Sequence, residues 1–345
     1  MKRSTFMAIA IIVFLTILLV VMKLIYPDSN KEAIKTVLAG KEWLNMEFGS
    51  DRMELKGKTT LVVFWNYTDI TSKKTLKKVM EWKGKYSALL QVAGVHSPEF
   101  TFEKEIKNIK KSVEELKIKF PVVLDNNAEL KAAFKNEAVP ALYIISKEGK
   151  VVFSHSGDGD YEVSETAIRE ALAKAAPSSR LPEFIRSPIT GLCFPTTLDL
   201  YLSISKGAVA NKEGLVPDKS HNYKAIKEIL EDSIALTGKF KASKESLGSD
   251  GTGAVVSLNF TAMEVNLVAE ASNDEATLEV LLNGKPVKKD SKGKNLDDKN
   301  QVKLKGPGLY QLIKNKNKPE KGILTIKNLK GDYRLYAFRF YGCSE

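Results

Sequence analysis

The residue pattern of this chain changes once, near residue 176, and that change limits the folds that the chain can adopt. Between residues 43 and 176, strand-like and helix-like periods alternate. The continuous apolar run at 60–65 is typical of a central strand covered on both faces, and 103–116 carries apolar residues at helical spacing. The order β-α-β-α-(β)-α-β-β-α predicts an α/β domain at 43–176, with a mixed sheet between helices.

A different pattern follows the Pro- and Ser-containing linker at 177–190. Residues 191–345 contain short β-rich runs separated by turns, which predict an all-β sandwich of jelly-roll-like topology. Asn283-Gly284 is a strong signal for a two-residue hairpin turn. One helical signal remains at 223–230, and the charged segment 285–305 is expected to be an exposed loop. The runs lie at 255–260, 265–269, 278–282, 308–313, 322–326 and 333–340.

The N-terminal segment determines the expected compartment. An apolar stretch at 6–26 follows Lys2 and Arg3, and it is long enough to cross a bilayer as a helix. The alternative is a cleaved signal peptide, which has a shorter apolar region and a small-residue cleavage site. The positive-inside rule places residues 1–5 in the cytoplasm. We therefore expect a single-pass anchor in the cytoplasmic membrane, a spacer at 27–42 and globular domains on the extracytoplasmic (periplasmic or cell-surface) side.

The amino-acid composition limits the metals, cofactors and nucleic acids that the chain is expected to bind. The chain has 345 residues and a net charge of +11, with 53 Lys and Arg against 42 Asp and Glu. The basic residues are scattered, so we expect a solvated Lys-rich surface and no nucleic-acid partner. Two cysteines and three histidines are too few for a zinc finger, an iron–sulfur cluster or a His-rich metal cage, so neither a metal nor a cofactor is expected.

Residues 64–72 carry a resemblance to a known family. They read Phe-Trp-Asn-Tyr-Thr-Asp-Ile-Thr-Ser and resemble the active-site segment of thioredoxin-like (redoxin-type) proteins. The likeness is to the extracytoplasmic half of DipZ-type thiol:disulfide interchange proteins, which read Phe-Trp-Thr-Tyr-Thr/Ser-Cys-Ile-Asn-Cys. Weaker matches follow in order at 43–45, 94–100, 120–126, 139–141, 155–161, 309–312 and 336–338.

The resemblance implies a thioredoxin-like fold for 43–176, followed by the family's β domain. It also implies that Pro140 is a cis proline that faces the active-site helix and helps to shape a groove for extended peptides. The expected groove residues are Trp65, Tyr67, Asp69, Val139 and Pro140.

Asp69 and Ser72 stand where the family has its two redox cysteines. Thiol–disulfide exchange requires a thiolate, which neither a carboxylate nor a hydroxyl can replace. A carboxylate at a helix N-terminus caps free N–H groups and interacts favourably with the helix dipole, so Asp69 is a good structural replacement. Asp69 could alternatively act as a nucleophile or general base, but no histidine or second carboxylate lies nearby in the sequence. We therefore predict no catalytic residue here.

Cys193 and Cys343 are the only thiols, near the two ends of the predicted sandwich. In an exported protein such a pair is compatible with a structural disulfide. The other readings are a relocated redox pair or two free thiols. His96 and His155 lie near strand ends, where a hydrogen-bonded structural role is expected for each.

These observations favour a membrane-anchored, thioredoxin-like envelope protein that binds a peptide or protein partner without catalysis. One alternative is a thiol–disulfide oxidoreductase that acts through Cys193 and Cys343 or through a partner's thiols. A second alternative is a glycan- or envelope-binding module on a thioredoxin-like stem.

Overall fold

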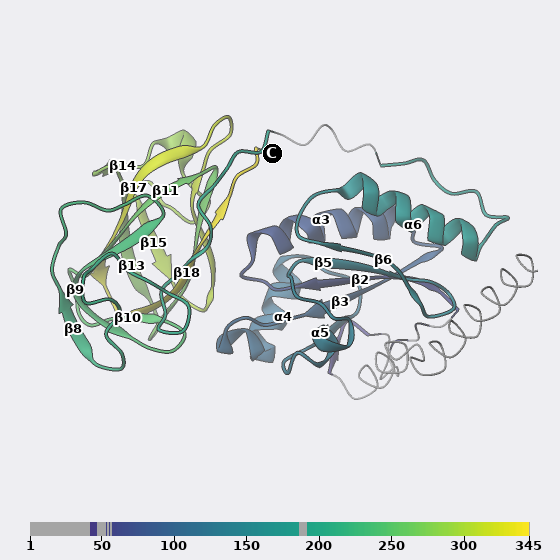
Figure 1. The fold of residues 1–345 in the computed structure, drawn as a ribbon, viewed down its shortest axis with the longest axis horizontal. Helices are drawn as coiled ribbons and strands as arrows, with labels where there is room; N and C mark the ends of the chain where they lie inside the picture. The colour runs from purple at the N-terminus through teal and green to yellow at the C-terminus, as the bar shows by residue number, and fades with distance from the viewer. Residues whose placement is uncertain (1–41, 47–52, 54, 56, 186–191, 345) are drawn as a thin grey trace, which may run out of the picture.

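The computed structural model describes residues 42–46, 53, 55, 57–185 and 192–344. They form an α/β domain and a β domain that lie side by side (Figure 1). The predicted anchor at 6–26 and nearly all of the spacer lie outside the described residues. The end of the linker at 186–190 and residue 191 also lie outside them. Among the helices that are described, none is both long and apolar enough to span a bilayer.

The α/β domain follows the predicted order of elements, with a mixed sheet in the order β1-β4-β3-β2-β5-β6. Strand β2 is parallel to β3 and antiparallel to β5. The elements are β1 (Trp43–Leu44), β2 (Thr59–Trp65), α3 (Ile70–Lys85), β3 (Leu90–His96), η1 (Thr101–Lys104), α4 (Ile106–Glu115), β4 (Val122–Leu124), α5 (Glu129–Ala133), β5 (Ala141–Ile145), β6 (Val151–Ser156) and α6 (Tyr161–Ala175).

Strand β2 is buried on both faces, which explains its continuous apolar sequence. Leu61 and Val63 belong to the apolar cluster that α3, α4 and α6 share, whereas Val62 and Phe64 belong to the cluster on the α5 side. The predicted double coverage of this strand is confirmed. Because β2 leads directly into α3, the sheet fixes the position of the N-terminus of α3.

The β domain is built from antiparallel pairings in the order β14-β13-β17-β11-β9-β10-β18-β12-β16, with β15, β7 and β8 attached at the sides. Its jelly-roll-like topology stays a prediction. The elements are β7 (Leu200–Tyr201), β8 (Ser220–Tyr223), β9 (Ser233–Ala242), β10 (Leu247–Ser249), β11 (Val255–Ala262), β12 (Glu264–Ala271), β13 (Ala276–Leu282), β14 (Lys285–Pro286), η2 (Lys289–Ser291), β15 (Gln301–Leu304), β16 (Gly308–Lys314), β17 (Glu320–Lys330) and β18 (Tyr333–Tyr341).

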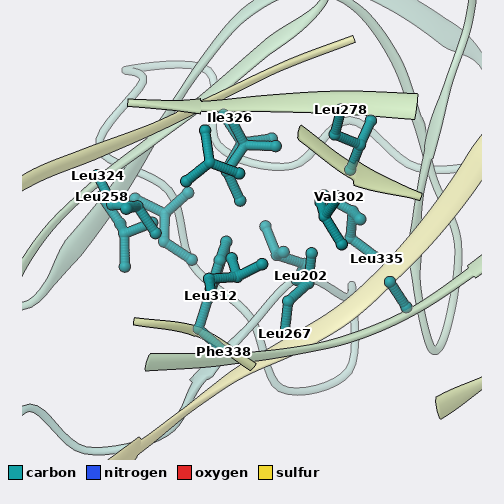
Figure 2. Packing of buried hydrophobic residues seen from close by; sticks show 14 of the residues in the cluster. Leu202, Leu258, Leu267, Leu278, Val302, Leu312, Leu324, Ile326, Leu335 and Phe338 are labelled. Atoms are coloured by element: carbon teal, nitrogen blue, oxygen red, sulfur yellow. The ribbon is translucent and has the colours of Figure 1, made fainter. Parts of the chain in front are cut away.

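Strand β9 joins the two halves of this domain. Its first half pairs with β11, up to the partners Thr237 and Val255, and its second half pairs with β8 and β10. Gly238 lies at the change of partner and has φ +92°, a conformation that a side chain disfavours. The two halves enclose an apolar core, and Figure 2 shows Leu258, Leu324 and Ile326 on one side of it and Leu267, Leu312 and Phe338 on the other.

Two local predictions have different outcomes. Asn283 and Gly284 have φ 51° and 70° and connect β13 to β14 with Leu282 opposite Lys285, so the predicted hairpin turn is confirmed. The helix predicted around 223–230 is wrong, because Tyr223 ends a strand. The ring of Tyr223 is buried in the core of the β domain, and its hydroxyl accepts a hydrogen bond from the Val216 N–H at 2.9 Å.

Cys193 and Cys343 are joined by a disulfide, as the sequence suggested, and 150 residues separate them. The two residues also form an isolated antiparallel β-bridge. The disulfide therefore ties the segment that enters the β domain to the segment that follows β18.

Candidate functional site at the domain interface

The N-terminus of α3 is capped by Asp69, as predicted. The Asp69 carboxylate accepts hydrogen bonds from the Ser72 N–H and from the Thr71 hydroxyl, the latter at 2.6 Å. Ser72 is buried, and its hydroxyl accepts a hydrogen bond from the Asn66 N–H at 3.4 Å. Both side chains that replace the family's redox cysteines therefore stabilise the turn that starts the helix.

The peptide bond between Val139 and Pro140 is cis, which confirms the cis bond that the resemblance implied. Pro140 is buried, and its carbonyl accepts a hydrogen bond from the Gly157 N–H at 2.8 Å. Val139 is partly exposed. Together with Asp69 it lines a cleft of about 810 Å³ between the two domains.

The other three expected groove residues, Trp65, Tyr67 and Pro140, do not line this cleft. Trp65 has no exposed surface, and Tyr67 keeps 3% of its surface exposed. Both rings pack against His96, with centroid distances of 5.2 Å and 5.6 Å. This corrects the expectation that they border the groove beside Asp69: they are part of the core beneath it, and Asn66 lines the cleft in their place.

The cleft is a product of both domains and is strongly polar. From the α/β domain it receives the turn before α3, the segment after β3 and the start of α5. From the β domain it receives Asp199, Tyr201, Lys206, Glu245 and Arg339. Side chains of both charge signs line it. The Asp125 carboxylate at the cleft wall accepts hydrogen bonds from two N–H groups of α5, at 2.8 Å and 2.9 Å.

Arg339 holds the β domain against the α/β domain at the cleft. Its buried guanidinium pairs with the carboxylates of Glu99 and Asp199 and donates a hydrogen bond to the Tyr201 hydroxyl at 3.3 Å. Glu99 also accepts hydrogen bonds from Tyr201 at 2.7 Å and from Lys206 at 2.8 Å. Burial raises the pKa of Glu99, but the charge of Arg339 and these hydrogen bonds outweigh it and lower that pKa to about 2.

A second set of contacts brings the β domain across α3. The Lys74 ammonium group lies 3.2 Å from the Glu264 carboxylate and 3.9 Å from the centre of the Tyr341 ring. The Tyr341 hydroxyl donates a hydrogen bond to Asp158 at 3.1 Å, in the loop before α6. The β domain is therefore docked along the end of the sheet where α3 begins.

Comparison with known proteins identifies the family. Residues 197–341 match the family described as "Thioredoxin like C-terminal domain". DipZ from Mycobacterium bovis is 32% identical over 249 residues, which cover 71% of this chain and 35% of DipZ. The thiol-disulfide oxidoreductase YkuV from Bacillus subtilis is 31% identical over 134 residues, which cover 39% of this chain and 90% of YkuV. This chain belongs to the thioredoxin-like family.

Among solved structures, a thioredoxin-like protein in its oxidized form is 30% identical with a TM-score of 0.36, covering 40% of this chain and 93% of that protein. This chain spans only about a third of the length of DipZ. The family's C-terminal domain at 197–341 falls in the β domain, and from here on we call the α/β domain before it the thioredoxin-like domain.

Glu103 is a feature of the thioredoxin-like domain that sequence reasoning missed. It is fully buried beside the turn at Asp69 and accepts hydrogen bonds from the Thr68 hydroxyl and the N–H groups of Glu99 and Phe100. Burial raises its pKa to about 7, even though these hydrogen bonds oppose the shift. Glu103 therefore changes charge near neutral pH, directly behind the cleft.

His96 is held by ring packing and not by the hydrogen bonds that the sequence suggested. Burial lowers the pKa of His96 to about 3, so its imidazole is neutral at ordinary pH. Neither ring nitrogen of His96, nor Nε2 of His155, has a hydrogen-bond partner among the described residues. Ring packing with Trp65 and Tyr67 holds His96 in place instead. Across the described ranges, no group of three or more His, Cys, Asp and Glu side chains is arranged to hold a metal ion.

Proposed function

We propose that this thioredoxin-like protein binds an extended, polar peptide segment of a partner protein in the cleft between its domains, without thiol–disulfide chemistry. The observation that carries the proposal is the position of Asp69 and Val139. The helix cap and the residue before the cis proline line one cleft of about 810 Å³, closed on its other side by the β domain.

The chemistry of the two positions on α3 supports a role in binding. Asp69 and Ser72 carry no sulfur, and both are already engaged in hydrogen bonds of the turn. The only two sulfur atoms that could form a dithiol belong to the disulfide between Cys193 and Cys343. That disulfide closes the β domain and does not lie at a helix N-terminus, the setting that makes a thiol reactive.

The lining of the cleft suits a peptide backbone better than an apolar ligand. Charged and amide side chains predominate in the lining, so carboxylate and amide oxygens are available to accept hydrogen bonds from the backbone amides of a bound peptide. An extended peptide supplies such amides at regular spacing.

Binding can be tested with a permanently unfolded, thiol-blocked polypeptide that carries a fluorescent label. Its anisotropy should rise when the wild-type protein is added. Val139→Trp fills the cleft and should weaken binding by about tenfold or more. Val163→Trp is the matched control, because Val163 is 57% exposed on α6, away from the cleft. Equal affinities for wild type and Val139→Trp, or no binding by wild type, would contradict the proposal.

We further propose that residues 6–26 anchor the protein in the cytoplasmic membrane with both domains outside. The apolar segment and the preceding Lys2 and Arg3 support this. In cells with a permeabilised envelope and an intact cytoplasmic membrane, added protease should digest both domains. The protein should also stay with the membrane after alkaline carbonate extraction. Protection from the protease, or release by carbonate, would contradict the anchored topology.

A further inference from the structure

A second cleft, of about 380 Å³, lies between the two domains next to α3 and α4. Lysines from both domains surround it. Lys73 and Lys111 come from the thioredoxin-like domain, and Lys294, Lys303 and Lys305 come from the β domain. Among the described residues that line this basic cleft, Glu115 is the single carboxylate, and there is no arginine. Five positive side chains therefore face one negative side chain.

Most of these ammonium groups have no counterion among the residues that the structure describes. Lys111 lies 3.9 Å from the Glu115 carboxylate in an exposed pair. For Lys73, Lys294, Lys303 and Lys305, no carboxylate of the described chain lies within ion-pair distance. Like charges that share a small volume repel one another, more strongly where part of the surrounding water is excluded. An anion in the basic cleft would relieve that repulsion.

Lys73 shows this unbalanced charge most clearly. It lies in the first turn of α3 and is partly buried between the domains. Burial, and after it the charge of Lys294, lowers the pKa of Lys73 to about 8. The other charged groups that act on Lys73 are Glu115, Asp69 and Glu103, and they oppose the shift without cancelling it. The folded protein thus holds an ammonium group where its charge is poorly compensated.

We propose that the basic cleft binds a ligand that carries at least two phosphate charges. Lysine binds phosphate as a point charge, so several lysines around one small volume suit a ligand that carries more than one negative charge. The five lysines of the lining match the high charge density of a phosphate ligand. The loop at 306–308 is Gly-Pro-Gly and leaves room for a phosphate group near the protein backbone. The proposal does not depend on peptide binding in the larger cleft.

Because both domains contribute lysines, the ligand would also strengthen the contact between them. Lys73 and Lys111 belong to α3 and α4, whereas Lys303 and Lys305 belong to β15 and the residue after it. A ligand that binds the assembled pair of domains, and not the separated domains, raises the melting temperature of the protein by mass action. A dose-dependent rise in Tm is therefore expected.

The experiment uses the full chain in nonionic detergent and isothermal titration calorimetry at low salt. Tripolyphosphate represents a soluble phosphate, and monomeric dihexanoyl phosphatidic acid represents a lipid headgroup. Citrate serves as a polycarboxylate control. Tripolyphosphate or the phosphatidic acid should bind, and the tighter of the two identifies the source. The proposal would be overturned if citrate bound as tightly as the tighter phosphate ligand, or if neither phosphate ligand bound.

Two double variants test the position of the site. Lys303→Glu with Lys305→Glu should weaken phosphate binding by about 30-fold or more, because two attractive charges become repulsive. Lys327→Glu with Lys330→Glu makes the same change of net charge at exposed positions of β17 that do not line the cleft, and it should leave the affinity within about twofold. Equal losses in the two variants would show that net charge alone attracts the ligand.

A third variant provides a readout that net charge alone would not move. Phosphate binding should raise the pKa of Lys73, so at a pH near 8 binding should take up protons, which calorimetry in buffers of different ionisation enthalpy detects. Lys73→Met should abolish the uptake while the far-UV circular dichroism stays unchanged. No proton uptake by the wild-type protein would contradict a phosphate group beside Lys73.

Discussion

The guanidinium of Arg339, on the last strand of the β domain, pairs with the carboxylate of Glu99 in the thioredoxin-like domain, across 240 residues of sequence. Arg339 also pairs with Asp199 and is itself buried. One side chain thus fixes the β domain beside the turn at Asp69 and completes the wall of the larger cleft.

Replacing Arg339 with leucine should destabilise the protein by about 3–5 kcal/mol, because Glu99 and Asp199 would remain as carboxylates without their main partner. Lys206→Ala removes a half-exposed partner of the same Glu99 and should cost about 1 kcal/mol or less. Thermal unfolding and the rate of proteolysis at the linker measure the two effects. Equal stability of the two variants would show that the buried pair does not hold the domains together.

Glu103 should make the stability of the protein fall as the pH rises. Its pKa is about 7 in the folded protein against 4.5 in a solvated chain, so the folded state binds the proton more tightly. This stabilisation is fully present below pH 4.5 and is lost by about pH 7, with a total of about 3 kcal/mol.

Glu103→Gln keeps a similar shape and cannot ionise. The difference between its free energy of unfolding and that of the wild type should therefore grow in favour of the variant from pH 4 to pH 8. Urea titrations at several pH values measure it. A difference that stays constant over this range would show that Glu103 does not titrate between the folded and unfolded states as described.

Gly238 should be the glycine of β9 that tolerates no side chain. A Cβ there would meet the Cα of Ala254 at 3.2 Å, and the residue has φ +92°. Gly238→Ala should cost about 1–3 kcal/mol. Gly248→Ala, on neighbouring β10, would meet only ordinary contacts at 3.6 Å and beyond, and should change stability by about 0.5 kcal/mol or less. Chemical denaturation of both variants tests this contrast. Equal losses of stability would show that the backbone conformation at Gly238, where β9 changes partners, does not require glycine.

Asp69 should contribute to stability as a helix cap. Asp69→Ala removes the acceptor for the Ser72 N–H and should destabilise the protein by about 0.5–2 kcal/mol, whereas Asp69→Asn should retain most of the cap. Glu105 occupies the same position before α4 but makes no side-chain cap bond, so Glu105→Ala is the matched control with little expected effect. If Asp69→Ala and Glu105→Ala unfold at the same denaturant concentration, the cap has no energetic role.

The α/β domain could be predicted because its signals are local. Strand β2 is buried on both faces and is therefore apolar throughout, and α4 shows a clear helical period. Strand β9 was not predicted from the sequence, and the reason is physical. It changes partners at Gly238, so its burial does not alternate regularly along Ser233–Ala242, and it contains Ser, Thr, Gly and Lys.

The candidate site was predictable only in part. The cap at Asp69 depends on residues three positions apart, and the sequence is sufficient to show it. Trp65 was misplaced, because a strand buried on both faces gives no sign of which side chain reaches the surface. The pairing of Glu99 with Arg339 depends on how two domains dock, and no local pattern in either segment indicates it.

The central claim is that α3 of this thioredoxin-like protein begins at a binding site and not at a redox centre. Reduction of insulin by dithiothreitol, with and without the protein, tests it most directly, using wild type, Cys193→Ser and the double variant Asp69→Cys with Ser72→Cys. We expect wild type and Cys193→Ser to match dithiothreitol alone, and the double variant to accelerate the reaction. Catalysis by the wild type that disappears in Cys193→Ser would contradict the account.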